Sequence, residues 1–276
     1  MKVRLAIPSD KKRILEISNT IWDGEDYVSN IIDNWINHEN GFLAVCEYNN
    51  TVVGFAKFTI IKNNDFWLEG IRADKNYKNL GIGSAITKFF ITEAKKRKYQ
   101  RLALSTYIEN YQSIHIIEKY GFKPKHYFKF LYAEPNILRK APHYNKVKNF
   151  NHALKIFDSS KLIAQNNLIH FDWSFITLDS QLLKFLFDRG DIYFYNDSFL
   201  ILSKYKNKTN DYSVSFISDN INNALSFSLN KAYLENKTIS IMANPNDNIN
   251  KFIKPLDLEE GVKGSIYDTI YYEYLP

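Results

Sequence analysis

The chain has 276 residues, enough for two domains of ordinary size, and its hydrophobic fraction of 45% excludes a largely disordered protein. The formal net charge of +6 suits a polyanionic cofactor, an acidic partner or nucleic acid, but the sequence shows no nucleic-acid-binding motif. The single Cys46 excludes an internal disulfide, and no apolar stretch suits a membrane span or a signal peptide, which predicts a cytoplasmic protein.

The first half of the chain predicts alternating strands and helices. Apolar runs and alternation indicate strands over residues 3–7, 42–48, 52–61, 66–73, 101–106 and 122–132. Helical periodicity and capping residues indicate helices over residues 8–17, 28–38, 81–98 and 110–121. The pair Asn49-Asn50 is typical of a tight turn that joins two strands into a hairpin.

The turn between the strand at 66–73 and the next helix carries Gly81 and Gly83. A backbone without a Cβ atom can approach a diphosphate closely, and the unpaired N–H groups and dipole of a helix start favour an anion. Two glycines alone are weak evidence, because an ordinary strand-to-helix loop would look the same. The stretch leaves both interpretations open.

Two motifs about thirty residues apart resemble those of the GNAT superfamily of N-acetyltransferases, which bind acetyl-coenzyme A. The phosphate loop of that family is matched by Lys78-Asn79-Leu80-Gly81-Ile82-Gly83, which follows Ile71-Arg72-Ala73-Asp74. The family's later signature is matched by Asn110, Ser113 and Ile117-Glu118-Lys119-Tyr120-Gly121-Phe122. The resemblance implies the GNAT fold, a mixed and mostly antiparallel sheet flanked by helices, over roughly the first half of the chain. It also implies acetyl-CoA as cofactor, held by Ile71, Arg72, Ala73, Lys78, Asn79, Leu80, Gly81, Ile82, Gly83, Ser84, Asn110 and Ser113.

The chain departs from the family pattern at three positions. Lys78 replaces an arginine or glutamine but still offers donors, and Asn79 replaces a glycine but tolerates left-handed dihedral angles. Ile117 stands where many members have a tyrosine that can protonate the departing thiolate. Water or Tyr120 could take over this catalytic role, although an aromatic residue at position 120 is also explained by packing.

Glu69 is the candidate general base. A carboxylate in an apolar strand has a raised pKa if it is buried, and strand alternation predicts that Glu69, Ile71 and Ala73 share one face. The alternative is that Glu69 pairs with Arg72 or another cation and only holds the shape of the pocket.

Asp26 and Tyr27 are candidate substrate-binding residues. The chain resembles most closely a subset of the family that has an Asp-Tyr element before the second strand and a Glu-Gly-x-Arg strand. This subset includes two-domain proteins of the histidine N-acetyltransferase-like group, in which the region forms part of the acceptor pocket. Amphipathic helix packing is the alternative for both residues, and it is the preferred interpretation of Trp35.

The second half repeats the order of elements. It predicts strands over 191–195, 199–204, 212–217, 238–242 and 266–274 and helices over 178–187, 220–234 and 247–253. The counterpart of the glycine loop, residues 218–223, has no glycine and contains Asp219. We therefore expect a GNAT acetyl-CoA-binding domain over 1–134, a linker over 135–150 and a degenerate GNAT-like domain over 151–276 that shapes the acceptor pocket or a homodimer.

Together these features predict an acetyl-CoA-dependent N-acetyltransferase that transfers acetyl directly to a small primary amine, such as that of an amino acid. No metal, nucleic acid or membrane is expected to take part. One alternative is a non-catalytic acetyl-CoA-binding or regulatory protein, which Ile117 motivates. A basic nucleic-acid-associated module is the second alternative.

Overall fold

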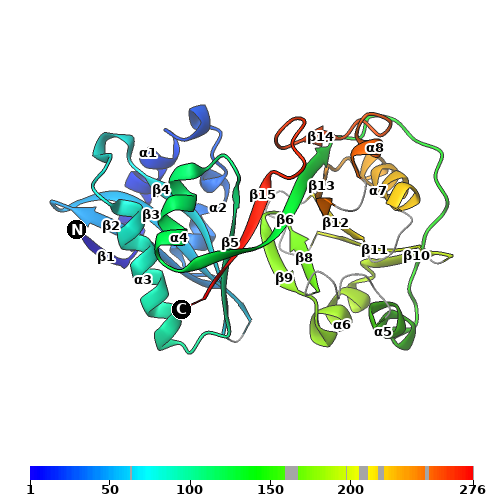
Figure 1. The fold of residues 1–276 in the computed structure, drawn as a ribbon, viewed down its shortest axis with the longest axis horizontal. Helices are drawn as coiled ribbons and strands as arrows, with labels where there is room; N and C mark the ends of the chain where they lie inside the picture. The colour runs from blue at the N-terminus through cyan, green and yellow to red at the C-terminus, as the bar shows by residue number, and fades with distance from the viewer. Residues whose placement is uncertain are drawn as a thin grey trace. The chain divides into compact units, whose positions relative to one another are not determined.

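The computed structural model describes residues 1–62, 64–158, 167–196, 198–204, 211–216, 221–245 and 249–275. The chain divides into two compact units, which are shown in Figure 1. The first unit comprises Met1–Lys125 and the C-terminal residues from Tyr271 on, and the second comprises His126–Ile270. The chain therefore changes units after Lys125 rather than near residue 134, and its C-terminal strand returns to the first unit.

The first unit is built on one mixed sheet. Its strands are β1 (Lys2–Leu5), β2 (Gly41–Tyr48), β3 (Thr51–Lys62), β4 (Asp65–Ala73) and β5 (Arg101–Tyr107), in the order β1-β2-β3-β4-β5, and the C-terminal strand β15 (Thr269–Tyr274) follows β5. Neighbours are antiparallel from β1 to β4, whereas β4 and β5 are parallel. This mixed, mostly antiparallel sheet is the predicted fold class.

Helices cover both faces of this sheet. Helices α1 (Lys11–Ser18) and α2 (Val28–Ile36) pack on one face, where Ile14 and Trp35 share a buried cluster with Val45 and Phe55. Helix α3 (Ile82–Lys96) packs on the other face through Phe90, and α4 (Tyr111–Lys119) lies beside α3 (Figure 1). These strands and helices are the predicted ones, with bounds that differ by a residue or two.

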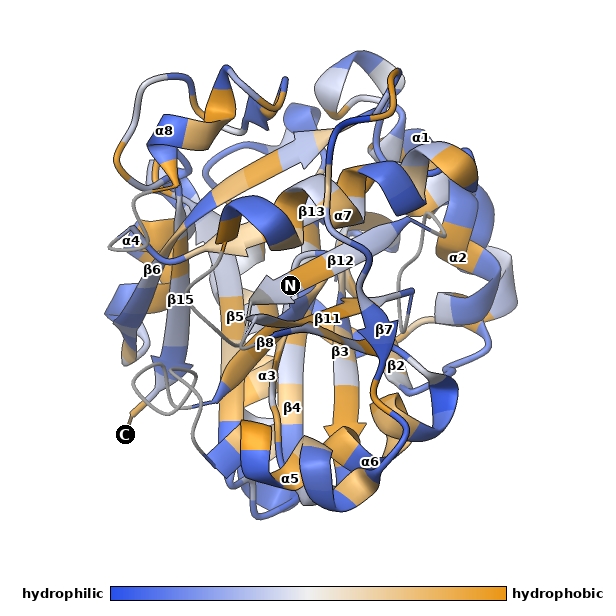
Figure 2. Cartoon of the chain, turned by 90° about the vertical axis from the view of Figure 1, so that its right-hand side faces the viewer, coloured by the Kyte–Doolittle hydropathy of each residue, from blue (hydrophilic) through white to orange (hydrophobic). Residues whose placement is uncertain are grey.

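The second unit has its own sheet. Its order is β6-β13-β12-β11-β10-β7, formed by β6 (Phe122–Ala133), β13 (Ile239–Ala243), β12 (Tyr212–Phe216), β11 (Ser198–Ser203), β10 (Ile192–Tyr195) and β7 (Asn145–Lys146), with β14 (Glu259–Glu260) beside β6. Its helices are α5 (Phe150–Asp158), α6 (Ser180–Arg189), α7 (Ile221–Leu234) and α8 (Asn250–Ile253). Figure 2 shows hydrophobic and hydrophilic stretches alternating along α5 and α6, as expected for helices with one buried face.

The element order of the first unit recurs in the second. Strands β10, β11 and β12 are antiparallel neighbours, and α7 then leads to β13, which is parallel to β12. The expected linker is part of this unit, because Tyr144 and Val147 are buried and β7 pairs with β10. The hairpin of β8 (Leu168–Phe171) and β9 (Ser174–Thr177), and helix α5, were not predicted. Residues 218–220 of the glycine-free turn lie outside the described residues.

Candidate active site

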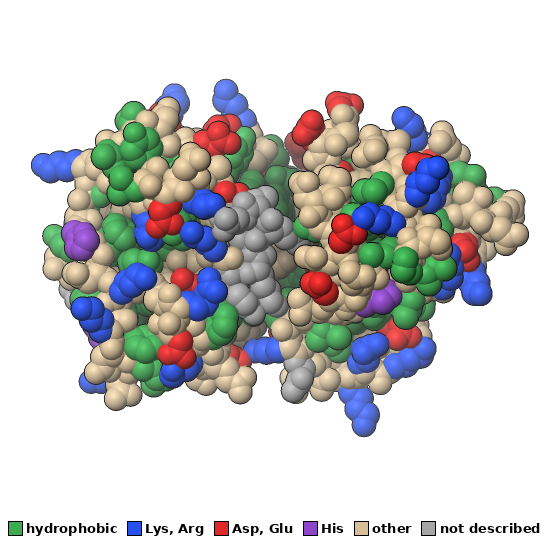
Figure 3. Space-filling view, turned by 180° about the vertical axis from the view of Figure 1, so that it is seen from behind, with side chains coloured by type: hydrophobic (Ala, Val, Ile, Leu, Met, Phe, Trp, Pro, Cys, Tyr) green, Lys and Arg blue, Asp and Glu red, His purple; other side chains and the backbone are tan. Residues whose placement is uncertain are grey.

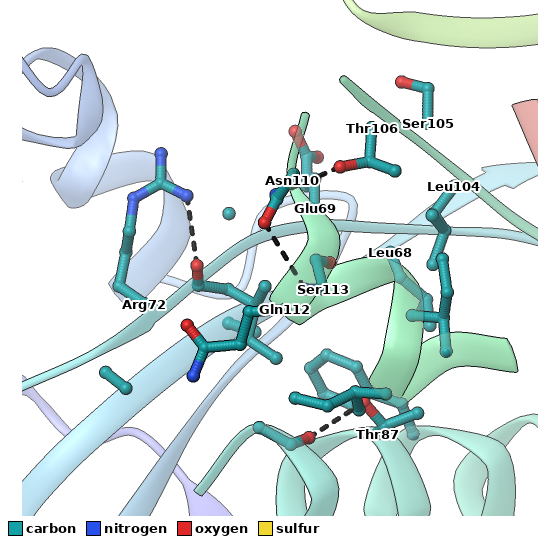
Figure 4. Close-up of a pocket in the computed structure, with 18 residues that line it drawn as sticks. Leu68, Glu69, Arg72, Thr87, Leu104, Ser105, Thr106, Asn110, Gln112 and Ser113 are labelled. Carbon is teal, nitrogen blue, oxygen red and sulfur yellow. Dashed lines mark hydrogen bonds between the residues drawn. The ribbon is translucent and has the colours of Figure 1, made fainter. Parts of the chain in front are cut away.

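A cavity opens where β4 and β5 separate. The two strands pair from Asp65↔Arg101 to Trp67↔Ala103, and both then continue, to Ala73 and Tyr107. The cavity at this point has a volume of about 270 Å³ (Figure 4). Its walls are Ala56, residues 68–73, Gly83, Thr87, Phe90, Leu104, Ser105, Thr106, Asn110, Gln112, Ser113, Ile116 and Ile117. Parted strands leave backbone N–H and C=O groups that a bound molecule can pair with.

A bulge in β4 decides which side chains face each other. Glu69 lies opposite Lys57 and Arg72 lies opposite Phe55, so three steps along β4 match two steps along β3. Gly70 has φ +66°, and a Cβ atom there would lie 2.4 Å from the ring of Trp35, so only glycine fits. The extra residue places Glu69 and Arg72 on one face and Ala73 on the other. The predicted common face of Glu69, Ile71 and Ala73 is therefore wrong.

Glu69 is half-buried and lines the cavity. The hydroxyl of Thr59 donates a hydrogen bond of 2.5 Å to Glu69 Oε1, which orients the carboxylate. The guanidinium of Arg72 pairs with Asp26. The alternative in which Glu69 pairs with a cation and only holds the shape of the pocket stays a prediction.

Arg72, Asp26 and their neighbours form one cluster. Arg72 Nε donates to Asp26 Oδ2 at 3.1 Å and Nη2 donates to Oδ1 at 3.0 Å, while Ser18 Oγ donates to Oδ2 at 2.8 Å. The ring centres of Trp22 and Tyr27 lie 4.7 and 5.7 Å from Arg72 Cζ. Asp26 is buried, and neither Asp26 nor Tyr27 is among the residues that line the cavity. Both residues therefore contact Arg72 rather than the cavity itself. Arg72, which we expected to hold the cofactor, instead turns its side chain to the face of α1 and α2.

The glycine loop contains two residues with left-handed backbone conformations. Asn79 has φ +62°, a left-handed conformation that asparagine tolerates, and Gly81 has φ +75° where it precedes α3. Helix α3 approaches β3 so closely that a Cβ atom on Gly54 would lie 2.4 Å from Ile82 Cγ2. The loop residues 78–81 are exposed, and Gly83 lines the cavity. The backbone N–H groups of the first turn of α3 therefore lie at the edge of the cavity.

Asn110 and Ser113 also lie in the cavity wall, but part of their polar capacity holds α4 in place. Asn110 Oδ1 accepts from the N–H of Ser113 at 3.3 Å and Asn110 Nδ2 donates to Thr106 Oγ1 at 3.0 Å. Sequence reasoning missed Thr106, which lies near the end of β5, and Gln112, which lies in the first turn of α4 beside Asn110 (Figure 4). Their position next to that cap is the signal that could have found them.

Ile117 and Tyr120 differ in their surroundings. Ile117 is buried and lines the cavity, where it presents an apolar side chain. Tyr120 is not among the lining residues, and its hydroxyl is hydrogen-bonded to Ser84. This bond and the nearby ammonium group of Lys88 lower the pKa of Tyr120, and Lys88 Nζ lies 5.5 Å from its ring centre.

The corresponding position in the second unit is filled. Strands β12 and β13 pair up to Val214↔Ile241, and the ring of His170 lies at the end of this pairing. Its Nε2 atom is 3.0 Å from the carbonyl oxygen of Val214 and accepts from the N–H of Met242 at 3.1 Å. Burial lowers the pKa of His170, which keeps the ring neutral.

Comparisons with known proteins agree with this geometry. Residues 12–122 match the acetyltransferase (GNAT) family. A solved structure assigned as an acetyltransferase from Thermoplasma acidophilum is 16% identical, covers all of both chains and has a TM-score of 0.61. A second, from Pyrococcus horikoshii, is 14% identical, covers 100% of this chain and 89% of its own, and also has a TM-score of 0.61.

Residues 12–122 of the chain therefore form a GNAT acetyltransferase domain, and the acetyl donor of that family is acetyl-CoA. This domain lies in the first unit, and the two solved structures share the fold of the whole chain.

The rest of the described structure adds two observations on partners. On the face seen in Figure 3, basic side chains are interspersed with acidic ones rather than gathered in one stripe. In the described part of the chain, no helix has both the length and the apolar character needed to cross a membrane.

Proposed function

We propose that the first unit transfers the acetyl group of acetyl-CoA directly to the primary amine of a small molecule such as an amino acid. The observation that carries this proposal is the parting of β4 and β5, which gives one cavity two kinds of wall. Gly83, Thr87 and Ser113 come from the side of α3 and α4, whereas Glu69 and Arg72 lie on the other face of the sheet. A cofactor and an acceptor can thus meet from opposite sides.

The residues present fit the cofactor. The backbone N–H groups of the exposed residues 78–81 and of the start of α3 can hold a diphosphate, and Lys78 adds a positive charge. The backbone of Ile71 and Ala73, beyond the last β4–β5 pair, can hydrogen-bond to an extended amide-containing arm. When bound, acetyl-CoA supplies an activated thioester. A backbone N–H group near Ile71 can polarise the carbonyl group of that thioester.

Glu69 is the proposed general base. It accepts a proton from the substrate ammonium, so that the free amine can form the new C–N bond as the C–S bond breaks. The hydrogen bond from the Thr59 hydroxyl fixes the orientation of the Glu69 carboxylate.

The thiolate leaves without help from a side chain in this proposal, because Ile117 is apolar and Tyr120 lies outside the cavity wall. A thiol has a pKa of about 8.5, so release of thiolate near pH 7 costs only about 2 kcal/mol. Water suffices for the later protonation.

A small acceptor fits this cavity better than an extended peptide does. The volume is about 270 Å³. Trp22 and Tyr27 pack against Arg72, which lines the cavity. A small acceptor needs only a closed pocket, and closing it excludes water from the thioester. A cytoplasmic location and a role of the second unit in the acceptor pocket or a homodimer stay predictions.

The test is a steady-state assay of thiol release with amino acids, polyamines and short peptides. We expect Glu69→Gln to lower turnover by about a hundredfold or more at neutral pH while acetyl-CoA affinity is kept, because the amide oxygen can still accept from Thr59. The deficit should shrink at high pH, where the free amine is abundant. Glu47→Gln is a matched control, since Glu47 is half-buried in the same unit and bonds to Arg4.

Two results would count against the proposal. Full activity in Glu69→Gln would remove the base, and faster turnover of peptides than of any small amine would remove the small acceptor. Acetyl-CoA binding without turnover of any amine would favour the non-catalytic alternative, for which the apolar Ile117 in the cavity wall is the specific observation.

A further inference from the structure

The guanidinium of Arg72 has two N–H groups to spare. Three of its five N–H groups are used within the described structure: Nε and Nη2 donate to Asp26, and Nη1 donates to the carbonyl oxygen of Ile71 at 3.1 Å. One N–H remains on Nη1 and one on Nη2. These two lie along the end of the guanidinium, the edge that binds a carboxylate through two parallel hydrogen bonds.

The neighbours of Arg72 hold this edge in place. Asp26 is 3% exposed and is itself fixed by Ser18, and the rings of Trp22 and Tyr27 pack against the guanidinium. The Arg72 side chain is 12% exposed. A donor pair that is already ordered loses little conformational entropy when a ligand binds, so the arrangement is suited to recognition.

Arg72 also lies at a suitable place relative to Glu69. Both residues line the cavity, and the bulge at Gly70 puts them on the same face of β4. Their partners, Phe55 and Lys57, are two residues apart on β3, a separation of about 7 Å. In Figure 4 the guanidinium and the Glu69 carboxylate stand on the same side of the strand. One small molecule with a cationic and an anionic group can contact both.

We propose that Arg72 binds a carboxylate of the acetyl acceptor while Glu69 receives the proton of its amine. The acceptor is then an α-amino acid or an equally compact amine with a neighbouring carboxylate. This inference rests on the proposed function and narrows its substrate class. Asp26 is a positioning residue, which acts by turning the free edge of Arg72 toward the cavity.

The decisive experiment compares each amino acid with its own carboxamide. The side chain is the same in both, and only the carboxylate is lost. Because loss of the carboxylate lowers the pKa of the amine, kcat/KM is calculated per concentration of free amine. We expect the wild-type protein to prefer the acid by about tenfold to a hundredfold, as for a bidentate charged hydrogen bond.

Two variants assign the preference to Arg72. Arg72→Lys keeps a positive charge near Asp26 but has no fork of donors, so the acid-to-amide ratio should fall toward one while the amide is still acetylated. Arg4→Lys is the matched control, because Arg4 bonds to Asp10 through both Nη atoms in the same unit, away from the cavity. It should lose comparable ion-pair stabilisation and keep the ratio of the wild type.

The outcomes separate this inference from the proposed function. Equal or better turnover of carboxamides by the wild-type protein overturns the role of Arg72 and leaves small-amine acetylation intact. An unchanged ratio in Arg72→Lys also overturns it. If no amine in the panel is acetylated, the proposed function fails and this inference fails with it.

Discussion

Replacement of His170 tests whether its buried ring is a structural part of the second unit, at the position that corresponds to the cavity of the first unit. The ring is buried and contacts three backbone groups, the N–H of Met242 and the carbonyl oxygens of Val214 and Asp172. A neutral ring with its proton on Nδ1 donates to Asp172 and accepts from Met242. His170→Ala removes the ring, and His170→Phe keeps most of its volume but neither hydrogen bond.

The expected magnitudes follow from these contacts. A buried N–H left without a partner destabilises by about 1–3 kcal/mol, so His170→Phe should lower the free energy of unfolding by about that amount. His170→Ala adds a cavity, and the total should reach about 3–5 kcal/mol. The difference between the two variants thus separates packing from hydrogen bonding.

The pH dependence has a definite sign. Burial lowers the pKa of His170 below its ordinary value of 6.5 in the folded state. Below about pH 6.5 the unfolded chain therefore binds a proton that the folded chain does not, and the free energy of unfolding falls as the pH falls. His170→Phe lacks this loss. The stability gap between wild type and His170→Phe should narrow below pH 6.5, by at most about 1.4 kcal/mol per pH unit.

Urea unfolding at several pH values between 5 and 8 would measure these differences. Because other titrating groups are shared, they cancel in the comparison of wild type with variant. A constant gap across this range would show that His170 is not held neutral, and no loss of stability in His170→Ala would refute its place in the core.

Two further predictions concern the cofactor. Gly83→Asp should abolish acetyl-CoA binding in calorimetry, because it puts a negative charge at the start of α3. Gly83→Ala is the control, because its Cβ atom makes the same close contact with Ile116 Cδ1, at 2.9 Å, without the charge. It should bind acetyl-CoA more tightly than Gly83→Asp does. Equal affinity of wild type and Gly83→Asp would rule out the loop assignment. The whole chain should bind one acetyl-CoA, since His170 occupies the position in the second unit that corresponds to the cavity and the turn at 218–223 has no glycine. A titration that shows two acetyl-CoA molecules per chain would contradict this.

The order of elements was predictable because each one carries a local signal. Turn residues and periodicity marked β2, β3, α3 and α4, and the same signals marked β10 to β13. The four-residue strands β8 and β9 escaped, because they pair only with each other in a separate hairpin and are too short for a clear pattern. The stretch around Tyr144 resembles a linker in composition, and only its burial shows that it belongs to the second unit.

The candidate site was predictable in its residues but not in its pairings. The motif indicated the loop and the lone carboxylate in an apolar strand indicated Glu69, yet simple alternation failed at Gly70, because the bulge depends on the partner strand and on Trp35. The pairing of Arg72 with Asp26 joins residues 46 positions apart. A local pattern carries no information about such a contact, so Arg72, Asp26 and Tyr27 take roles different from those that their positions imply.

The two units treat the same structural problem in opposite ways. Parallel strands that part leave buried N–H and C=O groups, and these must find partners. In the second unit His170 supplies one such partner, because its Nε2 atom accepts from the N–H of Met242 while its ring lies against the carbonyl group of Val214. In the first unit the β4–β5 pairing ends at Trp67 and the strands border a cavity instead. A cavity there is useful only if a ligand completes the pairing, which is why we assign acetyl-CoA and the acceptor to the first unit and a structural role to its counterpart.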